Sequence, residues 1–343
     1  MREVKNKLET EFLSENQTQR AAQILKSGGI VAIPTETVYG LAASAYDINA
    51  IKSIFNAKGR PSDNPLIVHI SDLKDIKDVV SEFPENAKKL AEKFWPGPLT
   101  MIMPKNSKIP AEVTGGLSSV AVRFPAHKLA QKIISQAGVP LVAPSANISG
   151  KPSPTKFEHV INDLNGKINA AVDGGECSVG LESTVVSMLS DIPKILRPGK
   201  ITAEDIKNIV GAVEIDRAVF EKPEETEKIL SPGMKYRHYS PKTPIKMIIG
   251  GTGEYTDFVN SKKNEGDLAL CLDEDIPFLE VSYISYGSAH DTASQSKNLF
   301  DALREVDNRG AKIVYAHYKE ADSLSAAVYN RLVRAAGFDI IKV

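Results

Sequence analysis

Short, continuous runs of apolar residues recur along this chain and limit what it can fold into more than any other feature. Such runs are typical of strands covered on both faces, and here they alternate with segments whose apolar residues recur at helical spacing. Strands are expected at 30–34, 66–70 and 139–143, and helices at 48–58 and 127–138. Two further strands, at 99–103 and 119–124, follow one another without a helix between them. The pattern therefore predicts an α/β protein with a mixed sheet.

The length of 343 residues suggests more than one domain. The segment 221–228, EKPEETEK, is charged and poor in apolar residues, as linkers are. From residue 244 onward, strands and helices alternate regularly, which predicts a smaller unit with a largely parallel sheet. We therefore expect a first α/β domain at 1–215, a linker or lid at 216–242 and a Rossmann-like α/β domain at 243–343.

The composition is that of a globular protein and argues against several classes. Apolar residues make up 42% of the chain, and 42 basic against 43 acidic side chains leave a net charge of -1. No overall basic field therefore favours nucleic-acid or membrane binding. The N-terminal segment lacks the apolar core of a signal peptide, and no apolar run is long enough for a membrane span. We therefore expect a cytoplasmic protein. Because Cys177 and Cys271 lack metal-ligand spacing, we expect no resident metal.

The stretch IPTETVYGLAA, residues 33–43, interrupts an apolar run with a row of hydrogen-bonding side chains. That is more polar chemistry than a turn requires. Two other predicted strands end in a similar way, in RFP-AH and VAP-SANISG. Each end taken alone could be an ordinary turn. Because ligands bind beyond the strand ends of α/β sheets, the three together could surround one pocket.

Basic side chains stand where an anionic ligand would need them. Lys58 and Arg60 flank Gly59 in AKGRPSDNP, and a Lys point charge beside an Arg fork suits a polyphosphate, although a lysine at a helix end also stabilises the helix dipole. His69 and Arg123 lie inside predicted strands. A strand histidine is more often a satisfied core residue. A buried arginine needs either an acidic partner or an anionic ligand such as a carboxylate.

The common nucleotide-binding and nucleophile motifs do not occur. The sequence contains no GxxxxGK[ST], GxGxxG, HExxH or GxSxG pattern, although 173–184, DGGECSVGLEST, is rich in glycine. A nucleotide site would therefore be of another kind. The segment 231–241, SPGMKYRHYSP, interleaves basic and aromatic residues. It is either a strap between domains or a lid whose cations meet phosphates.

A series of motifs along the chain resembles the YrdC-type domain. In order, they are PTETVYGL, KGRP…NPLIVH, WPGPLT, VAVRFPAH, APSANISG, GLESTVV and LRPG. SPGMKYRHYSP followed by a smaller α/β domain resembles the long, two-domain form of the threonylcarbamoyl-AMP synthase family. The resemblance spans essentially the whole chain. It implies a twisted mixed-sheet domain that holds a nucleotide and an amino acid on its concave side, followed by a smaller Rossmann-like α/β domain.

The resemblance also implies a reaction and a set of site residues. L-Threonine, bicarbonate or CO2, and ATP carrying Mg2+ would give threonylcarbamoyl-AMP and pyrophosphate. The product would pass to a tRNA-modifying complex, and direct binding of tRNA stays open. The residues implied at threonine are Thr37, His69, Arg123, Ala143 and Ser183. Those implied at ATP are Arg60, Asn64, Ser119, Ser145, Asn147, Ser153, Arg197 and Tyr236. Lys58 and Arg60 are implied as catalytic.

On this reading, PTETVYG is one wall of the threonine and carbamate pocket. Pro34 would end the strand, Gly40 would let the chain turn away, and Glu36 would orient a neighbouring cation. No covalent enzyme intermediate is required, which agrees with the missing nucleophile motifs. The step needs positioning and charge neutralisation instead.

Two other readings compete with this one. A non-catalytic RNA-binding module would use a basic concave sheet despite the neutral total charge, and would bind RNA with strong salt dependence. A relative that transfers a carbamoyl group in another pathway would carry acylphosphatase-like or zinc-finger segments, and neither CxxC pairs nor such extra length occur here.

Overall fold

The protein is described by a computed structural model that divides into two compact units. The described residues are 8–222, 239–262, 266–320 and 322–343. The first unit comprises Met1–Ser149 and Pro154–Cys177, and the second comprises Gly150–Ser153 and Ser178–Val343. Each unit is described by itself below. The ranges 1–215, 216–242 and 243–343 inferred from the sequence stay predictions beside this division.

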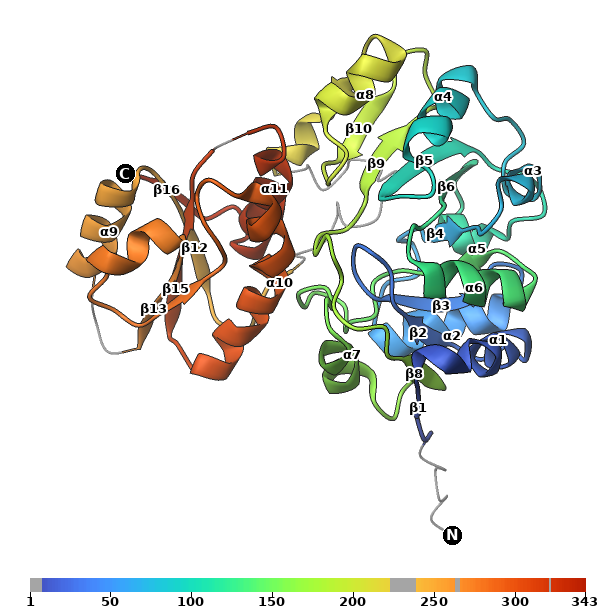
Figure 1. Ribbon diagram of the computed structural model, residues 1–343, viewed down its shortest axis with the longest axis horizontal. Coiled ribbons are helices and arrows are strands. Elements are labelled where there is room, and N and C mark those ends of the chain that lie inside the picture. The colour runs from blue at the N-terminus through green and yellow to red at the C-terminus, as the bar shows by residue number, and fades with distance from the viewer. Residues whose placement is uncertain (1–7, 223–238, 263–265, 321) are drawn as a thin grey trace. The chain divides into compact units, whose positions relative to one another are not determined.

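The first unit is built on a mixed sheet, as the sequence predicts (Figure 1). Its strands are β1 (Glu11–Leu13), β2 (Val31–Ile33), β3 (Gly40–Ser44), β4 (Ile67–His69), β5 (Leu99–Pro104), β6 (Ser119–Arg123), β7 (Leu141–Val142) and β8 (Ala170–Val172). Their order in the sheet is β1-β8-β2-β3-β7-β4-β6-β5. β8 pairs in parallel with β1 and β2, and β4 with β6. The remaining pairs are antiparallel.

Helices follow the strands of this sheet. They are α1 (Thr18–Lys26), α2 (Ile48–Lys58), α3 (Ile76–Val79), α4 (Glu85–Phe94), α5 (Ala111–Thr114), α6 (Lys128–Ala137) and α7 (Phe157–Leu164). Those predicted at 48–58 and 127–138 are confirmed, whereas the short helix between β5 and β6 was not expected. The predicted ends of α2 are confirmed. The Asp47 side chain caps its first turn by accepting from the amides of Asn49 and Ala50, and Gly59 ends it in the left-handed region at φ 61°.

The core of the first unit lies between the sheet and the helix pair α1 and α6. Leu25 and Ile133 from the helices are buried against Val31 and Leu141 from the strands. Removing an apolar side chain of this size from water contributes about 1.5–3 kcal/mol. This layer fixes the strands whose ends carry the candidate site.

One expectation about the PTET segment is wrong. Gly40 does not turn the chain away: it begins β3, which runs antiparallel to β2 with Ile33 opposite Gly40. A Cβ atom at Gly40 would lie 3.1 Å from the Cβ atom of Ala143. The glycine therefore allows β3 to approach the end of β7 closely. The polar residues that precede it form the connection between two antiparallel strands.

The second unit contains a short ribbon and a parallel sheet flanked by helices. The ribbon strands are β9 (Thr184–Ser187), β10 (Lys194–Arg197) and β11 (Glu214–Ile215), and helix α8 (Ala203–Val210) connects β10 to β11. The sheet strands are β12 (Ile245–Ile249), β13 (Asp267–Cys271), β14 (Tyr283–Ser285), β15 (Ile313–Tyr318) and β16 (Ile340–Lys342), in the order β14-β13-β15-β12-β16. The flanking helices are α9 (Thr252–Ser261), α10 (Thr292–Arg309) and α11 (Ser325–Ala335). α9 lies on one side of the sheet, with α10 and α11 on the other (Figure 1), which confirms the predicted Rossmann-like unit.

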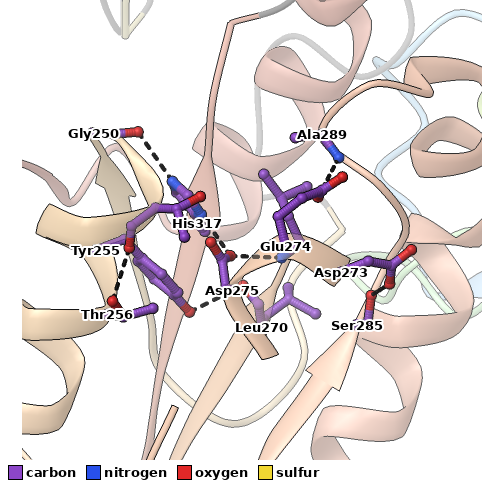
Figure 2. Close-up of polar contacts among 12 residues, drawn as sticks. Gly250, Tyr255, Thr256, Leu270, Asp273, Glu274, Asp275, Ser285, Ala289 and His317 are labelled. Carbon is purple, nitrogen blue, oxygen red and sulfur yellow. Dashed lines mark hydrogen bonds and ion pairs between the residues drawn. The ribbon is translucent and has the colours of Figure 1, made fainter. Parts of the chain in front are cut away.

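A buried polar network lies beside the strands of this parallel sheet (Figure 2). His317 on β15 has one ring nitrogen 2.7 Å from Asp275 Oδ2 and the other 3.1 Å from the Gly250 carbonyl oxygen. Both ring nitrogens therefore have a polar partner. The ring also stacks on Tyr255, with 4.2 Å between the centroids. The ring thus bridges the Asp275 carboxyl group and the Gly250 carbonyl within the interior of this unit.

Asp275→Ala is expected to destabilise the protein by about 1–3 kcal/mol for each buried group left without a partner, namely the His317 ring nitrogen and the Leu272 amide. Both side chains of the Asp275–His317 pair are fully buried. The matched control is Glu305→Ala, which breaks an exposed pair with Arg309 at 2.8 Å and should cost less than about 1 kcal/mol. Urea unfolding of the full chain measures both. Equal, small losses in the two variants would show that the buried pair adds nothing.

Candidate active site

The connection between β2 and β3 holds the guanidinium of Arg123. This side chain comes from the end of β6 and is only 4% exposed. Its Nη1 donates to Thr37 Oγ1 at 2.8 Å, and its Nη2 lies 2.7 Å from Glu36 Oε1. Neither Nε nor Nη2 of Arg123 has an acceptor with hydrogen-bond geometry among the described residues, although Nη2 lies within ion-pair distance of Glu36. The acidic partner expected for a buried strand arginine is therefore present, and Glu36 does orient a neighbouring cation.

Glu36 is held as a carboxylate by this contact. Burial alone would raise the pKa of the Glu36 carboxyl, but the charge and hydrogen bond of Arg123 outweigh it and hold the pKa below its ordinary value. The pair is therefore ionised at neutral pH. A ligand carboxylate would meet a guanidinium whose orientation Glu36 and Thr37 already fix, with the Nε–H donor still to be used.

His69 on β4 stands next to this cluster, opposite Arg123 in the parallel register of β4 and β6. Burial, with the Arg123 charge second, lowers the pKa of His69 to about 3, so the ring is neutral. Its Nδ1 lies 3.1 Å from the Ile67 carbonyl oxygen. A carbonyl can only accept, so Nδ1 carries the proton and Nε2 is an acceptor. His69 therefore offers a lone pair, not a charge.

We expect His69 not to titrate between about pH 5 and pH 8, the range in which an ordinary histidine changes charge. Its folded pKa of about 3 lies below the ordinary 6.5, so the unfolded chain binds the extra proton between these values. The stability that the neutral ring contributes is complete above pH 6.5 and is lost as the pH falls toward 3. The NMR shift of the ring, assigned with His69→Gln, measures this. A titration midpoint near the ordinary value would contradict the buried, neutral ring.

The second cluster of the first unit forms around Lys58, the last residue of α2. Its ammonium is 1% exposed and donates to the carbonyl oxygens of Ser145 and Asn147, the latter at 2.6 Å. The Asn147 Oδ1 atom lies 3.5 Å away. The amide of Ser149 in turn donates to the Lys58 carbonyl at 2.9 Å. Lys58 thus places a positive charge at the loop that follows β7 and ties that loop to the end of α2.

Backbone hydrogen bonds join the two clusters. The Ala146 amide donates to the Tyr39 carbonyl at 2.8 Å, and the Leu41 amide donates to the Pro144 carbonyl at 2.7 Å. The loop held by Lys58 therefore lies directly beside the connection that holds Arg123. Ala143, the residue predicted at threonine, directly follows β7, and its amide donates to the Ile67 carbonyl at 3.1 Å. The predicted convergence of strand ends is present for these two loops.

Three more predicted nucleotide residues belong to the first unit. Arg60 follows α2, and its Nη2 donates to the Pro65 carbonyl at 3.1 Å. Asn64 is 4% exposed, and its Oδ1 atom has no hydrogen-bond partner among the described residues. Ser119 begins β6 and is buried. The 60–65 loop therefore carries a buried polar atom that a ligand could satisfy.

The remaining predicted residues belong to the second unit or are not described. Arg197 Nε donates to the Ser183 carbonyl at 3.1 Å, and Nη2 donates to Ser183 Oγ at 3.2 Å. Ser153 Oγ donates to Glu182 Oε1 at 2.5 Å. These residues therefore form one group within their own unit. Tyr236 lies outside the described residues.

Neither a metal cluster nor a spanning helix is found in the described parts of the chain. Among residues 8–222, 239–262, 266–320 and 322–343, no group of three or more His, Cys, Asp and Glu side chains is placed to hold a metal ion. The helices in these ranges are too short or too polar to cross a membrane.

Comparison with known proteins agrees with this geometry. The Sua5/YciO/YrdC family profile, described as "Telomere recombination", matches residues 23–199, and a profile described as "Threonylcarbamoyl-AMP synthase, C-terminal domain" matches residues 201–337. Proteins named threonylcarbamoyl-AMP synthase from Pyrococcus abyssi and Bacillus subtilis are 44% and 42% identical to it, each over 97% of this chain and over 98% and 97% of their own lengths. The crystal structure of P. abyssi Sua5 complexed with L-threonine is 41% identical and superposes with a TM-score of 0.89, covering 97% of this chain and 99% of that one. The chain therefore belongs to the threonylcarbamoyl-AMP synthase family, in its long form with a YrdC-type part and a C-terminal α/β part.

Proposed function

We propose that this chain is an L-threonylcarbamoyladenylate synthase, which converts L-threonine, bicarbonate and ATP into threonylcarbamoyl-AMP and pyrophosphate. The relatives of similar length carry that enzyme name, and a solved relative is described as a complex with L-threonine. Within the first unit, one observation supports the proposal most. A buried guanidinium with an unused Nε–H donor lies in a connection hydrogen-bonded to the loop that holds the Lys58 charge.

Threonine would bind at the Arg123 cluster. Its carboxylate would accept from Arg123, whose orientation Thr37 and Glu36 fix by contacts of 2.8 and 2.7 Å. The neutral His69 would accept a hydrogen bond from a donor of the amino acid, because its Nε2 carries a lone pair. Ala143 and Ser183 complete the proposed threonine set.

ATP would bind along the loops that follow α2 and β7. Lys58 and Arg60 supply positive charge for the phosphates, with Lys58 acting from within the loop that its carbonyl contacts hold in place. The other proposed nucleotide contacts are Asn64, Ser119, Ser145, Asn147, Ser153, Arg197 and Tyr236. Positive charge placed in advance of the reaction is what a phosphoryl centre requires.

The reaction needs two bonds to form. Bicarbonate takes up a proton and loses water, which gives CO2. The threonine amine attacks the carbon of CO2 and loses a proton, which gives a carbamate. A carbamate oxygen then attacks the α-phosphorus of ATP, and the bond from that phosphorus to the bridging oxygen breaks as pyrophosphate leaves. The protein's part is to hold the carbamate oxygen and the α-phosphorus within reach of one another.

The other participants follow from this chemistry. Mg2+ would arrive with the ATP phosphate oxygens, since oxygen ligands suit it. The threonylcarbamoyl-AMP product would pass to the enzymes that modify adenosine in tRNA. A mixed anhydride of this kind is open to attack by water, so its consumer must take it up promptly.

Incubation of the protein with labelled bicarbonate, ATP and each amino acid in turn tests the function. Label should enter a nucleotide product with threonine, and pyrophosphate should be released in equal amount. An RNA-binding module would instead show no amino-acid specificity and a steep dependence of RNA binding on salt. Incorporation of label into a nucleotide without any amino acid, or to the same extent with every amino acid, would refute the synthase.

A further inference from the structure

Arg331 on α11 has no role in the proposed reaction so far, yet it is a fully buried charged side chain. It is 0% exposed and the largest among the fully buried side chains of the described residues. Arginine is almost never fully buried unless it is paired. The partners of its guanidinium should therefore indicate the role of this side chain.

Outside its own helix, the described contacts of Arg331 are with Glu182, Pro198 and Tyr239. Nε donates to Glu182 Oε2 at 3.0 Å and Nη2 donates to the Glu182 carbonyl at 3.3 Å. Nη1 donates to the Pro198 carbonyl at 2.8 Å. The guanidinium carbon lies 5.7 Å from the ring centre of Tyr239. Glu182 directly precedes Ser183, and Pro198 directly follows Arg197.

Each oxygen atom of the Glu182 carboxylate has a described side-chain partner. Oε2 accepts from Arg331 and Oε1 accepts from Ser153 at 2.5 Å. Arg197 instead donates to the carbonyl and the hydroxyl of Ser183. Two arginines thus stand near one buried acid, and only Arg331 forms a described ion pair with it.

The charge balance depends on this division. Burial alone would raise the pKa of the Glu182 carboxyl, but the charges of Arg331 and then Arg197, together with the Ser153 hydrogen bond, hold the pKa below its ordinary value. Glu182 is therefore a carboxylate at neutral pH. Among the described residues, the other cation whose charge acts on Glu182 is Arg197. Without Arg331, Glu182 should attract Arg197, because an unpaired buried charge is strongly unfavourable.

We infer that Arg331 is a positioning residue for the reaction: by pairing with Glu182 it leaves Arg197 on Ser183, where these two residues are set to contact ATP and threonine. The inference rests on the proposed function. It assigns α11, in the C-terminal part of the chain, an effect on substrate affinity that acts through Glu182 and Arg197. It also explains why an arginine is needed, since a single guanidinium spans the Glu182 carboxylate, the Glu182 carbonyl and the Pro198 carbonyl.

The test compares Arg331→Met with the wild-type full chain in threonine-dependent pyrophosphate release. With Arg197 drawn to Glu182, the KM for ATP should rise by about tenfold or more, the size expected for a lost charged contact. A purely structural role would instead lower the active fraction, which reduces kcat and leaves KM unchanged. The split between KM and kcat therefore separates the two.

Two further variants sharpen the result. Arg331→Met combined with Glu182→Gln removes the charge that would attract Arg197, so the KM for ATP should return to within about threefold of wild type. Arg334→Met is the matched control. It removes a buried cation from the same helix whose described hydrogen bond goes to the Ala218 carbonyl at 2.8 Å, and it should leave KM within about twofold.

The outcomes separate the inference from the function. An active wild type with unchanged KM in Arg331→Met, or a double variant no better than the single one, overturns the positioning role and leaves the synthase standing. A wild type that releases no pyrophosphate with threonine refutes the synthase and the inference with it. If Arg331→Met does not fold, Arg331→Lys keeps the charge but not the fork. It should then raise KM by about threefold, and wild-type KM in that variant overturns the inference.

Discussion

Arg123→Ala is expected to lower kcat/KM for threonine by about 10²–10⁴-fold. Two charged hydrogen bonds to the carboxylate would be lost, from Nε and from Nη2, the two guanidinium nitrogens without a hydrogen-bond acceptor among the described residues. Each is worth about 1.5–3 kcal/mol, and each 1.36 kcal/mol is about a factor of ten in rate. The side chain is 4% exposed and reaches Thr37 at 2.8 Å, so no water can easily replace it. Steady-state pyrophosphate release at varied threonine concentration measures the loss.

The substitution also leaves Glu36 as a buried charge without its partner, which by itself could unfold the site. Arg123→Ala combined with Glu36→Gln removes that charge, so stability should recover while activity stays low. Arg123→Lys keeps a positive charge but loses the forked geometry of the guanidinium. Its kcat/KM for threonine should lie between those of the wild type and of Arg123→Ala. If the double variant regains wild-type saturation by threonine, Arg123 does not bind the carboxylate.

Lys58→Met is expected to affect both stability and activity. It removes the donor for the carbonyl oxygens of Ser145 and Asn147, and each buried acceptor left without a donor costs about 1–3 kcal/mol. The loop that carries the proposed phosphate contacts then loses its anchor and its positive charge. We expect kcat/KM for ATP to fall by about 100-fold or more, measured together with urea unfolding.

Lys52→Met is the control for that variant. Lys52 lies on the same helix but is exposed, and a surface change of this kind usually alters stability by less than about 0.5 kcal/mol. Its activity should match the wild type. Loss of stability in Lys58→Met without any change in the KM for ATP would assign the lysine to the fold alone.

The fold was predictable where the sequence carries a strong local signal. The continuous apolar runs located β2, β4 and β6, and the helical spacing of apolar residues located α2 at 48–58, because these patterns act within their own segment. β3 was not predicted. Its residues follow a polar stretch directly, and the close approach of Gly40 to Ala143 that explains the glycine is a long-range contact.

The candidate site divides along the same line. Arg123 could be singled out because an arginine among valines needs a partner. The structure identifies that partner as Glu36, which lies in the connection between β2 and β3. Glu182 and Arg331 were missed as a pair. They are separated by 149 residues, and an arginine in an amphipathic helix gives no sign that it is buried. Only packing reveals such a contact.

A crystal structure of the protein with L-threonine and a non-hydrolysable ATP analogue tests the central claim most directly. We predict the threonine carboxylate within about 2.7–3.2 Å of the Arg123 guanidinium, with its amine facing the α-phosphate and the triphosphate lying on the loop held by Lys58. Threonine bound elsewhere, with the Arg123 guanidinium contacting only Glu36 and Thr37, would contradict this account.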